Sequence, residues 1–423
     1  MIKIPHRFFT LVQTKTLLAI LFLFASQASS AKPAFPQQKI VASDGATEDF
    51  FSFSVAIHKD TALIGAFKAD SKNKERDTGA AYVYTRKANT WQQQSKLIAN
   101  DGKPGDTLGG NLAIYGKVAV VGAIGHDQNG ENAGAAYVFE NRGSKWQQQA
   151  KLMASDSKQG AAFGQSIAVN EDTIVIGAPH DNTKGKSSGA VYIFSRTSEG
   201  WQQQAKLIAK DTAAGDVFGI SVAISGTTVL VGADLNDEKA NNAGAAYVFI
   251  RTKSGWRQQA KLMANDGGDT DIFGVRVALS GDTALISARR DDHGAKGVDS
   301  GSAYIFTRSA KTWRQQAKLI APDAKADDRF GRDVALVGDT AVIGAMHRDE
   351  KGENAGAAYL YTRSHNLWKF TDKLIADDGA AGDLFGWSVG LSENSAVIGT
   401  PRNDDAGSES GSAYIFDLSA EDN

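Results

Sequence analysis

The sequence predicts an all-β fold: a seven-bladed β-propeller of four-stranded antiparallel blades, closed by an N-terminal strand that completes the last blade. Three observations predict it. The chain repeats itself about every 55 residues, each period holds four short strand-like segments, and the two ends of the chain carry complementary parts of one repeat. A period of this length is typical of solenoids, propellers and arrays.

Six tryptophans and a recurring Phe-Gly pair mark the repeats. The tryptophans are separated by 55, 55, 55, 57 and 55 residues, at Trp91, Trp146, Trp201, Trp256, Trp313 and Trp368. Phe-Gly pairs begin at Phe163, Phe218, Phe273, Phe330 and Phe385. Degenerate pairs at Phe51-Ser52 and Leu108-Gly109 extend the series, which therefore indicates seven repeats.

Each repeat reads as four antiparallel strands, as residues 221–264 illustrate. The segments "SVAIS", "TVLVGA", "GAAYVFIR" and "WRQQAKLMA" are rich in Val, Ile, Tyr and Phe and are separated by Gly, Asn, Asp and Ser. Such runs favour strands, and none has a helical period of sufficient length. Small residues in the first two segments suit strands that crowd a propeller axis. An open solenoid would need atypical capping repeats at both ends, which the sequence does not contain.

The two ends of the chain predict how the ring closes. The last repeat contains three strand-like segments and lacks the Trp-Gln-Gln segment that ends the other repeats. A similar segment, "FPQQKIVASDG", begins at Phe35 with only a leader before it. If residues 37–42 supply the outer strand of the last blade, every blade has four strands and no sheet edge is left open.

Residues 1–31 read as a signal peptide, and residues 32–423 as a single propeller domain. Basic residues flank the apolar run Leu17–Ala25, and small residues follow it. This run is too short to span a bilayer, although an N-terminal membrane anchor is the alternative reading. We therefore expect export to the periplasm, the cell surface or the medium, with no membrane insertion after cleavage.

The charge balance limits the classes of partner. Removal of the leader leaves 43 basic and 48 acidic residues, a net charge of −5. This balance argues against nucleic acid or an anionic membrane as a partner bound through general charge. The chain has no cysteine, so an exported protein would derive its stability from burial and ring closure. We expect the mature chain to be a monomer.

Aspartates recur in the loops between the second and third strands. Because antiparallel strands alternate direction, these loops share one face with the loops that precede each first strand; we call it the loop face. All length variation falls there, with ten residues in five repeats and twelve in the first and fifth. The aspartates are Asp70, Asp127, Asp181, Asp237, Asp292, Asp349 and Asp404. They could bind divalent cations or a basic partner, or each could cap its own loop.

The fifth repeat departs most from the common pattern. Ser287 replaces a glycine, and Arg289, Arg290 and His293 follow it. Such a departure marks a candidate asymmetric binding site, with neutral drift as the alternative. The tryptophans that begin the outer strands favour packing between blades over carbohydrate stacking. Trp387 differs because it lies in a first strand, where it would face the channel or the next blade.

No motif for catalysis or zinc binding is present. There is no Gly-x-Ser-x-Gly, no cysteine nucleophile, no phosphate loop and no HExxH. The chain is therefore expected to be no enzyme. Propellers do host carbohydrate-cleaving enzymes, so a carbohydrate-binding or carbohydrate-cleaving propeller is the alternative.

The order of motifs resembles the FG-GAP repeat, the blade unit of integrin α-subunit propellers. Phe-Gly is followed by "SVAIS", "VIGA" and "GAAYVF", and the resemblance covers residues 35–420. The variant is similar to that of bacterial exported FG-GAP proteins. Integrin-type repeats often carry an Asp-x-Asp-x-Asp-Gly calcium loop between the first two strands. Here that place holds short turns such as Ser225-Gly226-Thr227-Thr228, so calcium would have to bind elsewhere.

What the resemblance implies is adhesion or macromolecular recognition and not chemistry. We therefore predict an exported propeller that recognises a macromolecular ligand, either protein or polysaccharide, through the loop face. No cofactor is required by this reading.

Overall fold

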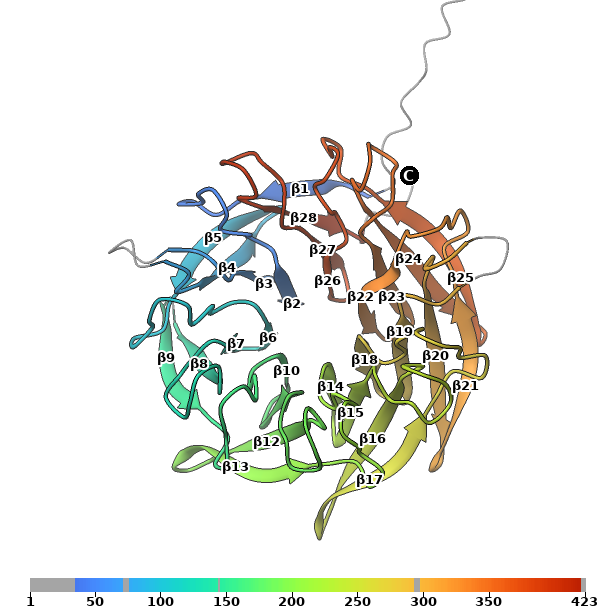
Figure 1. Ribbon diagram of the computed structural model, residues 1–423. Coiled ribbons are helices and arrows are strands. Elements are labelled where there is room, and N and C mark those ends of the chain that lie inside the picture. The colour runs from blue at the N-terminus through green and yellow to red at the C-terminus, as the bar shows by residue number, and fades with distance from the viewer. Residues whose placement is uncertain (1–34, 71–75, 144, 293–296, 420–423) are drawn as a thin grey trace, which may run out of the picture. The chain divides into compact units, whose positions relative to one another are not determined.

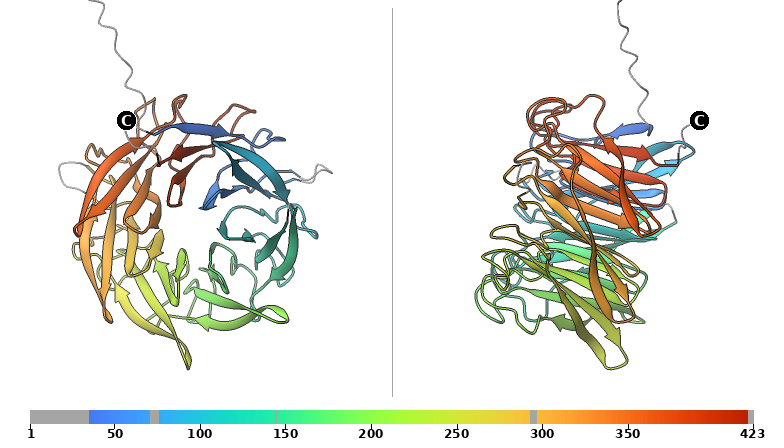
Figure 2. Two further views of the ribbon diagram at one scale, coloured as in Figure 1. Left: turned by 180° about the vertical axis from the view of Figure 1, so that it is seen from behind. Right: turned by 90° about the vertical axis from the view of Figure 1, so that its right-hand side faces the viewer.

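The computed structural model describes residues 35–70, 76–143, 145–292 and 297–419, within the chain's second unit, Ala34–Asn423. These residues form seven four-stranded antiparallel sheets arranged radially around an axis (Figures 1 and 2). The fold prediction is therefore confirmed. The described residues contain no helix, and hence none that could cross a bilayer. The predicted signal peptide lies outside the described residues.

The blades follow one another along the chain. Blade 1 contains Ser54–His58 (β2), Thr61–Ala66 (β3), Ala80–Lys87 (β4) and Thr90–Leu97 (β5); blade 2 contains Leu112–Tyr115 (β6), Val118–Ala123 (β7), Ala135–Arg142 (β8) and Lys145–Leu152 (β9). Blade 3 contains Ser166–Val169 (β10), Thr173–Ala178 (β11), Ala190–Thr197 (β12) and Gly200–Leu207 (β13); blade 4 contains Val222–Ser225 (β14), Thr228–Ala233 (β15), Ala245–Thr252 (β16) and Gly255–Leu262 (β17). Blade 5 contains Val277–Ser280 (β18), Thr283–Ala288 (β19), Ser302–Ser309 (β20) and Thr312–Leu319 (β21); blade 6 contains Phe330–Val337 (β22), Thr340–Ala345 (β23), Ala357–Ser364 (β24) and Leu367–Leu374 (β25). Blade 7 contains Ser388–Leu391 (β26), Ser395–Thr400 (β27), Ser412–Asp417 (β28) and, from the N-terminus, Gln37–Ile40 (β1).

The N-terminal strand completes blade 7, as the sequence predicts. β1 pairs antiparallel with β28, from Gln37 opposite Phe416 to Ile40 opposite Ala413. It has 4 residues, against 8 in the fourth strand of the other blades, and so is shorter than the expected 37–42. Figure 1 shows it along the outer edge of β28. The ring is thus closed by strands from both ends of the chain.

The core consists of clusters between neighbouring sheets. The Phe-Gly phenylalanines are fully buried, and each packs against the strand-3 tyrosine of its own blade. Phe218 lies edge-on to Tyr247, with ring centroids 5.5 Å apart. Strand-2 glycines let the next blade come close. A Cβ added at Gly232 would lie 1.9 Å from the carbonyl oxygen of Gly274, so no side chain fits there.

The junction between blades 5 and 6 departs from this pattern. Ser287 occupies the place of the strand-2 glycine in blade 5, and its Oγ donates to the carbonyl of Arg276 at 3.4 Å. On the other side of the junction, β22 begins already at Phe330 and shifts register between Phe330 and Val334. The asymmetry that the sequence shows in the fifth repeat therefore extends to the backbone of the sixth.

A Tyr–Asp–Lys triad links each pair of neighbouring blades. A strand-3 tyrosine and a strand-4 lysine bind the same aspartate, which follows the fourth strand of the preceding blade. The triads are Tyr82–Asp44–Lys96, Tyr137–Asp101–Lys151, Tyr192–Asp156–Lys206, Tyr247–Asp211–Lys261, Tyr304–Asp266–Lys318, Tyr359–Asp323–Lys373 and Tyr414–Asp378–Lys39. Since Lys39 belongs to β1, the closing blade uses the same link as the others.

The tryptophans of the outer strands also join blades. Trp146 Nε1 donates to Gln94 Oε1 of the preceding blade at 3.1 Å, and Trp313 Nε1 to Gln259 Oε1 at 3.0 Å. The prediction that these rings connect blades is confirmed at these positions.

Candidate functional site

Six of the predicted loop-face carboxylates hold their own loops. Asp127 Oδ1 accepts the N–H of Asn132 at 2.8 Å, and Asp349 Oδ1 accepts that of Asn354 at 2.8 Å. The same bond is made by Asp70, Asp237, Asp292 and Asp404. All six are exposed. Among the residues that the structure describes, no three His, Asp or Glu side chains group so as to hold a metal ion.

In the third blade an asparagine takes the place of the loop-capping aspartate and makes the same hydrogen bond to the backbone. There Asn182 Oδ1 accepts the N–H of Ser187 at 2.7 Å, while Asp181 is buried and binds Lys206 Nζ at 2.9 Å and Tyr192 Oη at 3.1 Å. Asp181 therefore binds the tyrosine and the lysine of the Tyr192–Asp156–Lys206 triad and does not belong to the set of exposed loop carboxylates. An amide replaces a carboxylate as the loop cap, so the cap does not need a charge. A role of the six exposed carboxylates in ligand binding stays a prediction.

The predicted arginines of the fifth repeat lie at the mouth of the axial channel. Arg289 is half-buried and Arg290 is exposed, both at the start of the loop after β19. His293 lies outside the described residues.

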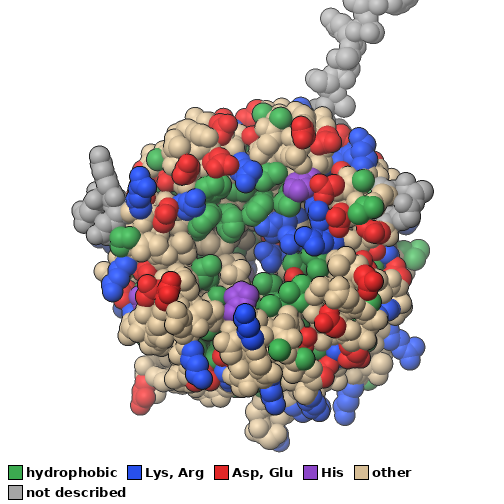
Figure 3. All heavy atoms as spheres, in the orientation of Figure 1, with side chains coloured by type: hydrophobic (Ala, Val, Ile, Leu, Met, Phe, Trp, Pro, Cys, Tyr) green, Lys and Arg blue, Asp and Glu red, His purple; other side chains and the backbone are tan. Residues whose placement is uncertain are grey.

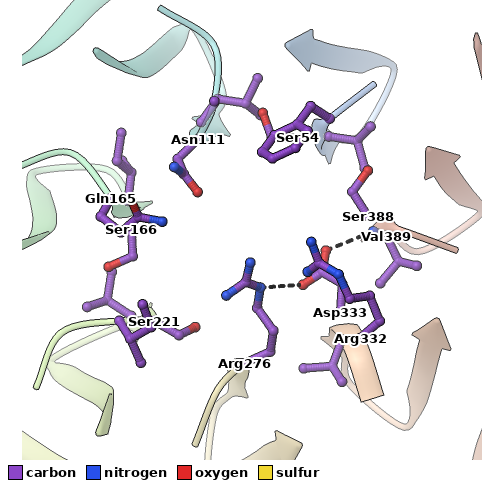
Figure 4. Close-up of a pocket in the computed structure, with 18 of the residues that line it drawn as sticks. Ser54, Asn111, Gln165, Ser166, Ser221, Arg276, Arg332, Asp333, Ser388 and Val389 are labelled. Atoms are coloured by element: carbon purple, nitrogen blue, oxygen red, sulfur yellow. Dashed lines mark hydrogen bonds and ion pairs between the residues drawn. The ribbon is translucent and has the colours of Figure 1, made fainter. Parts of the chain in front are cut away.

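The first strands of all seven blades line a channel on the axis, with a volume of about 360 Å³. The position three residues after the start of each Phe-Gly pair, or of its degenerate copy, contributes the same kind of side chain in five blades: Ser54, Asn111, Ser166, Ser221 and Ser388. These are small and neutral, and several bond the neighbouring blade, as Ser166 Oγ does to the carbonyl of Gly219 at 2.7 Å. In blades 5 and 6 the same position holds Arg276 and Asp333. Figure 4 shows both side chains reaching into the channel.

Asp333 serves two neighbours. Its Oδ2 accepts the N–H of Val389 in blade 7 at 2.9 Å, and its Oδ1 lies 3.5 Å from Arg276 Nε. Burial raises the pKa of Asp333, while Arg276, the Val389 N–H and Arg332 oppose this rise. Asp333 thus joins two blades and partly compensates two arginines.

Arg332 lies beside this pair and forms no salt bridge with the residues that the structure describes. Its side chain is directed to the axis, and its guanidinium carbon stands 3.8 Å from the centroid of the Trp387 ring. The residue is only 7% exposed, and its Nε finds no hydrogen-bond acceptor among the described residues. Burial, together with Arg276 and Arg289, holds the pKa of Arg332 well below its usual range, although the neighbouring Asp333 opposes this fall. The channel therefore contains a buried cation that the protein itself compensates only in part, through Asp333.

Arg289 and Asp234 extend the charged region. Burial, reinforced by Arg276, lowers the pKa of Arg289 to about 10. Burial raises the pKa of Asp234 to about 6 in spite of Arg289 and Arg276, and Asp234 Oδ1 has no hydrogen-bond donor among the described residues. Two carboxylates of this region, Asp234 and Asp333, thus lie near four arginines: Arg276, Arg289, Arg290 and Arg332.

An aromatic wall borders the arginines. Trp387 lies 5.2 Å from Phe53, Phe53 lies 4.4 Å from Phe67, and Phe67 lies 5.6 Å from Phe50, all between ring centroids. Lys68 Nζ stands 5.0 Å over the ring of Phe50. Figure 3 shows hydrophobic side chains on one side of the central opening and Lys and Arg side chains on the other. We call Arg276, Arg289, Arg332 and this wall, with the flanking Lys68 and Arg290, the channel mouth.

Sequence reasoning identified Arg289, Arg290 and Trp387 but missed Arg276, Arg332 and Asp333. The signal was present, since each missed residue lies two or three positions after a Phe-Gly phenylalanine. Comparing that position across the seven repeats, small and neutral in five of them, would have marked blades 5 and 6.

Comparison with known families gives seven matches. The FG-GAP repeat matches residues 35–84, 91–139, 146–194, 201–249, 256–306, 313–361 and 368–416. No curated protein matches the chain.

Solved structures share the fold at low sequence identity. A chain in the crystal structure of the mitotic checkpoint complex aligns with a TM-score of 0.54 and 9% identity, over 96% of this chain and 98% of that chain. Saccharomyces cerevisiae Sqt1 aligns with a TM-score of 0.46 and 10% identity, over 88% of this chain and 97% of that chain. At such identity the first likeness shows the fold alone.

Proposed function

The chain belongs to the FG-GAP repeat family, and we propose that it is an exported, non-enzymatic binding propeller that recognises a macromolecular ligand at the channel mouth on the loop face. Propellers of such repeats commonly bind proteins. Export is supported by the apolar run Leu17–Ala25 with its flanking residues, which resembles a signal peptide.

One observation carries the proposal: side chains that break the seven-fold pattern gather at one place. Where five blades have Ser or Asn, blades 5 and 6 place Arg276 and Asp333, and Arg332 lies next to them. A buried charge without a partner costs folding free energy, and a small neutral residue would avoid this cost. Such a costly feature is understandable where a ligand supplies the missing interactions.

The loop face also has the variable loops that are typical of a binding surface. Its loops vary in length, whereas the turns of the opposite face are uniform, and variable loops on a rigid scaffold usually carry binding function. The exposed carboxylates Asp127, Asp237, Asp349 and Asp404 lie in loops of the same face and are a second set of candidate contacts.

The test compares two charge reversals on opposite parts of the molecule. The purified chain is immobilised and used to capture ligands from a glycan array and from protein extracts. The mouth variant is Lys68→Glu with Arg290→Glu, and the control is Arg257→Glu with Arg314→Glu on the exposed outer strands β17 and β21. We expect a ligand that the control retains and the mouth variant loses. Retention by both variants, or hydrolysis of an arrayed glycan, contradicts the proposal.

A further inference from the structure

Arg332 is the strongest indication of what the channel mouth binds. It is more than nine-tenths buried, its Nε has no acceptor among the described residues, and its ring neighbour Trp387 offers only a π face. A guanidinium group presents five N–H donors in a planar fork that matches a carboxylate or a phosphate. The unsatisfied Nε–H therefore points to an anionic group from outside the chain.

The neighbouring charges strengthen this indication. Asp333 compensates Arg332 only in part: it raises the pKa of Arg332, but burial and the charges of Arg276 and Arg289 outweigh this effect. Asp333 is also engaged by Val389 N–H and by Arg276. Arg276 and Arg289 both act on Arg332 with the same sign of charge. An anion in the channel would relieve this repulsion, and its attraction to Arg332 would be stronger than in bulk water because Arg332 is buried.

The aromatic wall specifies the rest of the ligand. Phe53 and Phe67 stand next to Trp387 and are half-buried, so each keeps some surface open at the mouth. An apolar group beside the anion could cover them and gain from the burial of that area.

The surroundings of the mouth disfavour a polyanion. Exposed carboxylates on the loops, including Asp237 and Asp349, would repel a sulfated or phosphorylated chain that runs across the face. A single carboxylate that enters the channel avoids them. The volume of about 360 Å³ suits one or two side chains.

We propose that the channel mouth binds a polypeptide segment by inserting one carboxylate side chain between Arg276 and Arg332, with a neighbouring aromatic or aliphatic side chain against Phe53 and Phe67. This inference rests on the proposed function and names its ligand class. Arg332 donates to the carboxylate while it remains stacked on Trp387. Arg276 donates from the neighbouring blade 5, and Arg289 contributes through its charge.

The test uses two peptides that differ by one group. Isothermal titration measures the binding of acetyl-Gly-Phe-Asp-Phe-Gly-amide and of the same peptide with Asn in place of Asp. We expect the Asp peptide to bind the full chain at least about tenfold more tightly, as expected for hydrogen bonds to a charged group. This preference should fall when the salt concentration rises.

Variants connect that preference to the site. Arg332→Gln and Arg276→Gln should each remove most of the preference, Arg332→Lys should keep part of it, and the exposed control Arg257→Gln should leave it unchanged. Thermal melting checks that each variant is folded, and two independent arginines keep the test valid if one variant unfolds.

Other outcomes overturn the inference. These are equal affinity for the two peptides, no measurable binding of the Asp peptide, or tighter binding of inorganic phosphate or a sulfated disaccharide. If any of them occurs while Lys68→Glu with Arg290→Glu still abolishes ligand capture, the carboxylate site is wrong and the proposed function stands. If capture is also unaffected, both are wrong.

Discussion

Lys39 Nζ lies 2.8 Å from Asp378 Oδ2, joining two residues 339 positions apart in the chain. Tyr414 Oη donates to the other oxygen of the same carboxylate at 2.6 Å. Burial opposes the ionisation of Asp378, but the hydrogen bonds from Lys39 and Tyr414 outweigh it and hold its pKa below the ordinary value. The N-terminal strand therefore closes the ring with the polar link that joins the other blades.

The first prediction concerns this closure. Lys39→Met removes the link while keeping the aliphatic stem, and we expect a loss of about 1–2 kcal/mol in the free energy of unfolding, measured by urea denaturation. The control is Lys117→Met, at an exposed turn, which should change stability little. Equal stability of the two variants would show that the closing triad contributes nothing.

A second prediction concerns the cost of the buried cation. Replacing Arg332 by Met removes a buried charge that Asp333 compensates only in part, and we expect stabilisation by about 1 kcal/mol or more, even though the contact with Trp387 is lost. The exposed Arg257→Met serves as control and should melt as the wild type does. A lower melting temperature for Arg332→Met would mean that Arg332 holds the fold together and is not kept for a ligand.

A third prediction concerns pH. Burial raises the pKa of Asp271 to about 6; the neighbouring carboxylates of Asp291 and Asp292 add to this rise, while the Gly268 N–H and Lys318 oppose it. Between about pH 4 and pH 6 the folded protein binds more protons at this group than the unfolded chain does, so its contribution to stability falls as pH rises through that window.

Asp271→Asn should remove this dependence. The amide oxygen can still accept the N–H of Gly268, which binds Asp271 Oδ2 at 2.6 Å in the wild type. We therefore expect the stability of the variant relative to the wild type to increase from pH 4 to pH 7 in urea titrations. Glu393→Gln, at an exposed turn, should show no such trend. A constant difference between Asp271→Asn and wild type would contradict the raised pKa.

A fourth prediction separates the two roles of the loop carboxylates. Asp237 Oδ1 accepts the N–H of Asn242 at 2.7 Å, the bond that Asn182 makes in blade 3. Asp237→Asn should therefore leave stability within about 0.5 kcal/mol, whereas Asp237→Ala should cost about 1 kcal/mol in urea denaturation. If the Asn variant is stable but loses ligand, the carboxylate ring binds that ligand. If Ala and Asn variants are equally stable, the loop cap contributes nothing.

The repeat made most of the fold predictable. The regular spacing from Trp91 to Trp368 fixes the number of blades, and alternating strand-like runs fix their type. The incomplete last repeat predicts the pairing of β1 with β28, because an unpaired outer edge would be unfavourable. The length of β1 was overestimated because the pairing ends at Ile40, where the chain turns toward the loop of Asp44.

The site was less predictable because its residues come together only in the folded ring. Arg276 and Asp333 are 57 positions apart and belong to different blades, so no local motif joins them. Arg332 resembles an ordinary surface arginine in the sequence, and only the closed channel shows that it is buried against Trp387. The regularly spaced loop aspartates, by contrast, are obvious in the sequence, but in the structure they cap their own loops.

The most direct measurement of the central claim places the photo-reactive amino acid p-benzoylphenylalanine at Phe67, at the channel mouth, or at Phe370, which is 42% exposed on the outer strand β25. Both proteins are irradiated in the presence of the captured ligand, and covalent products are identified by mass spectrometry. We expect a product from position 67 that the Asp peptide suppresses, and none from position 370. A product from position 370 alone, or one from position 67 that the peptide leaves unchanged, would contradict binding at the channel mouth.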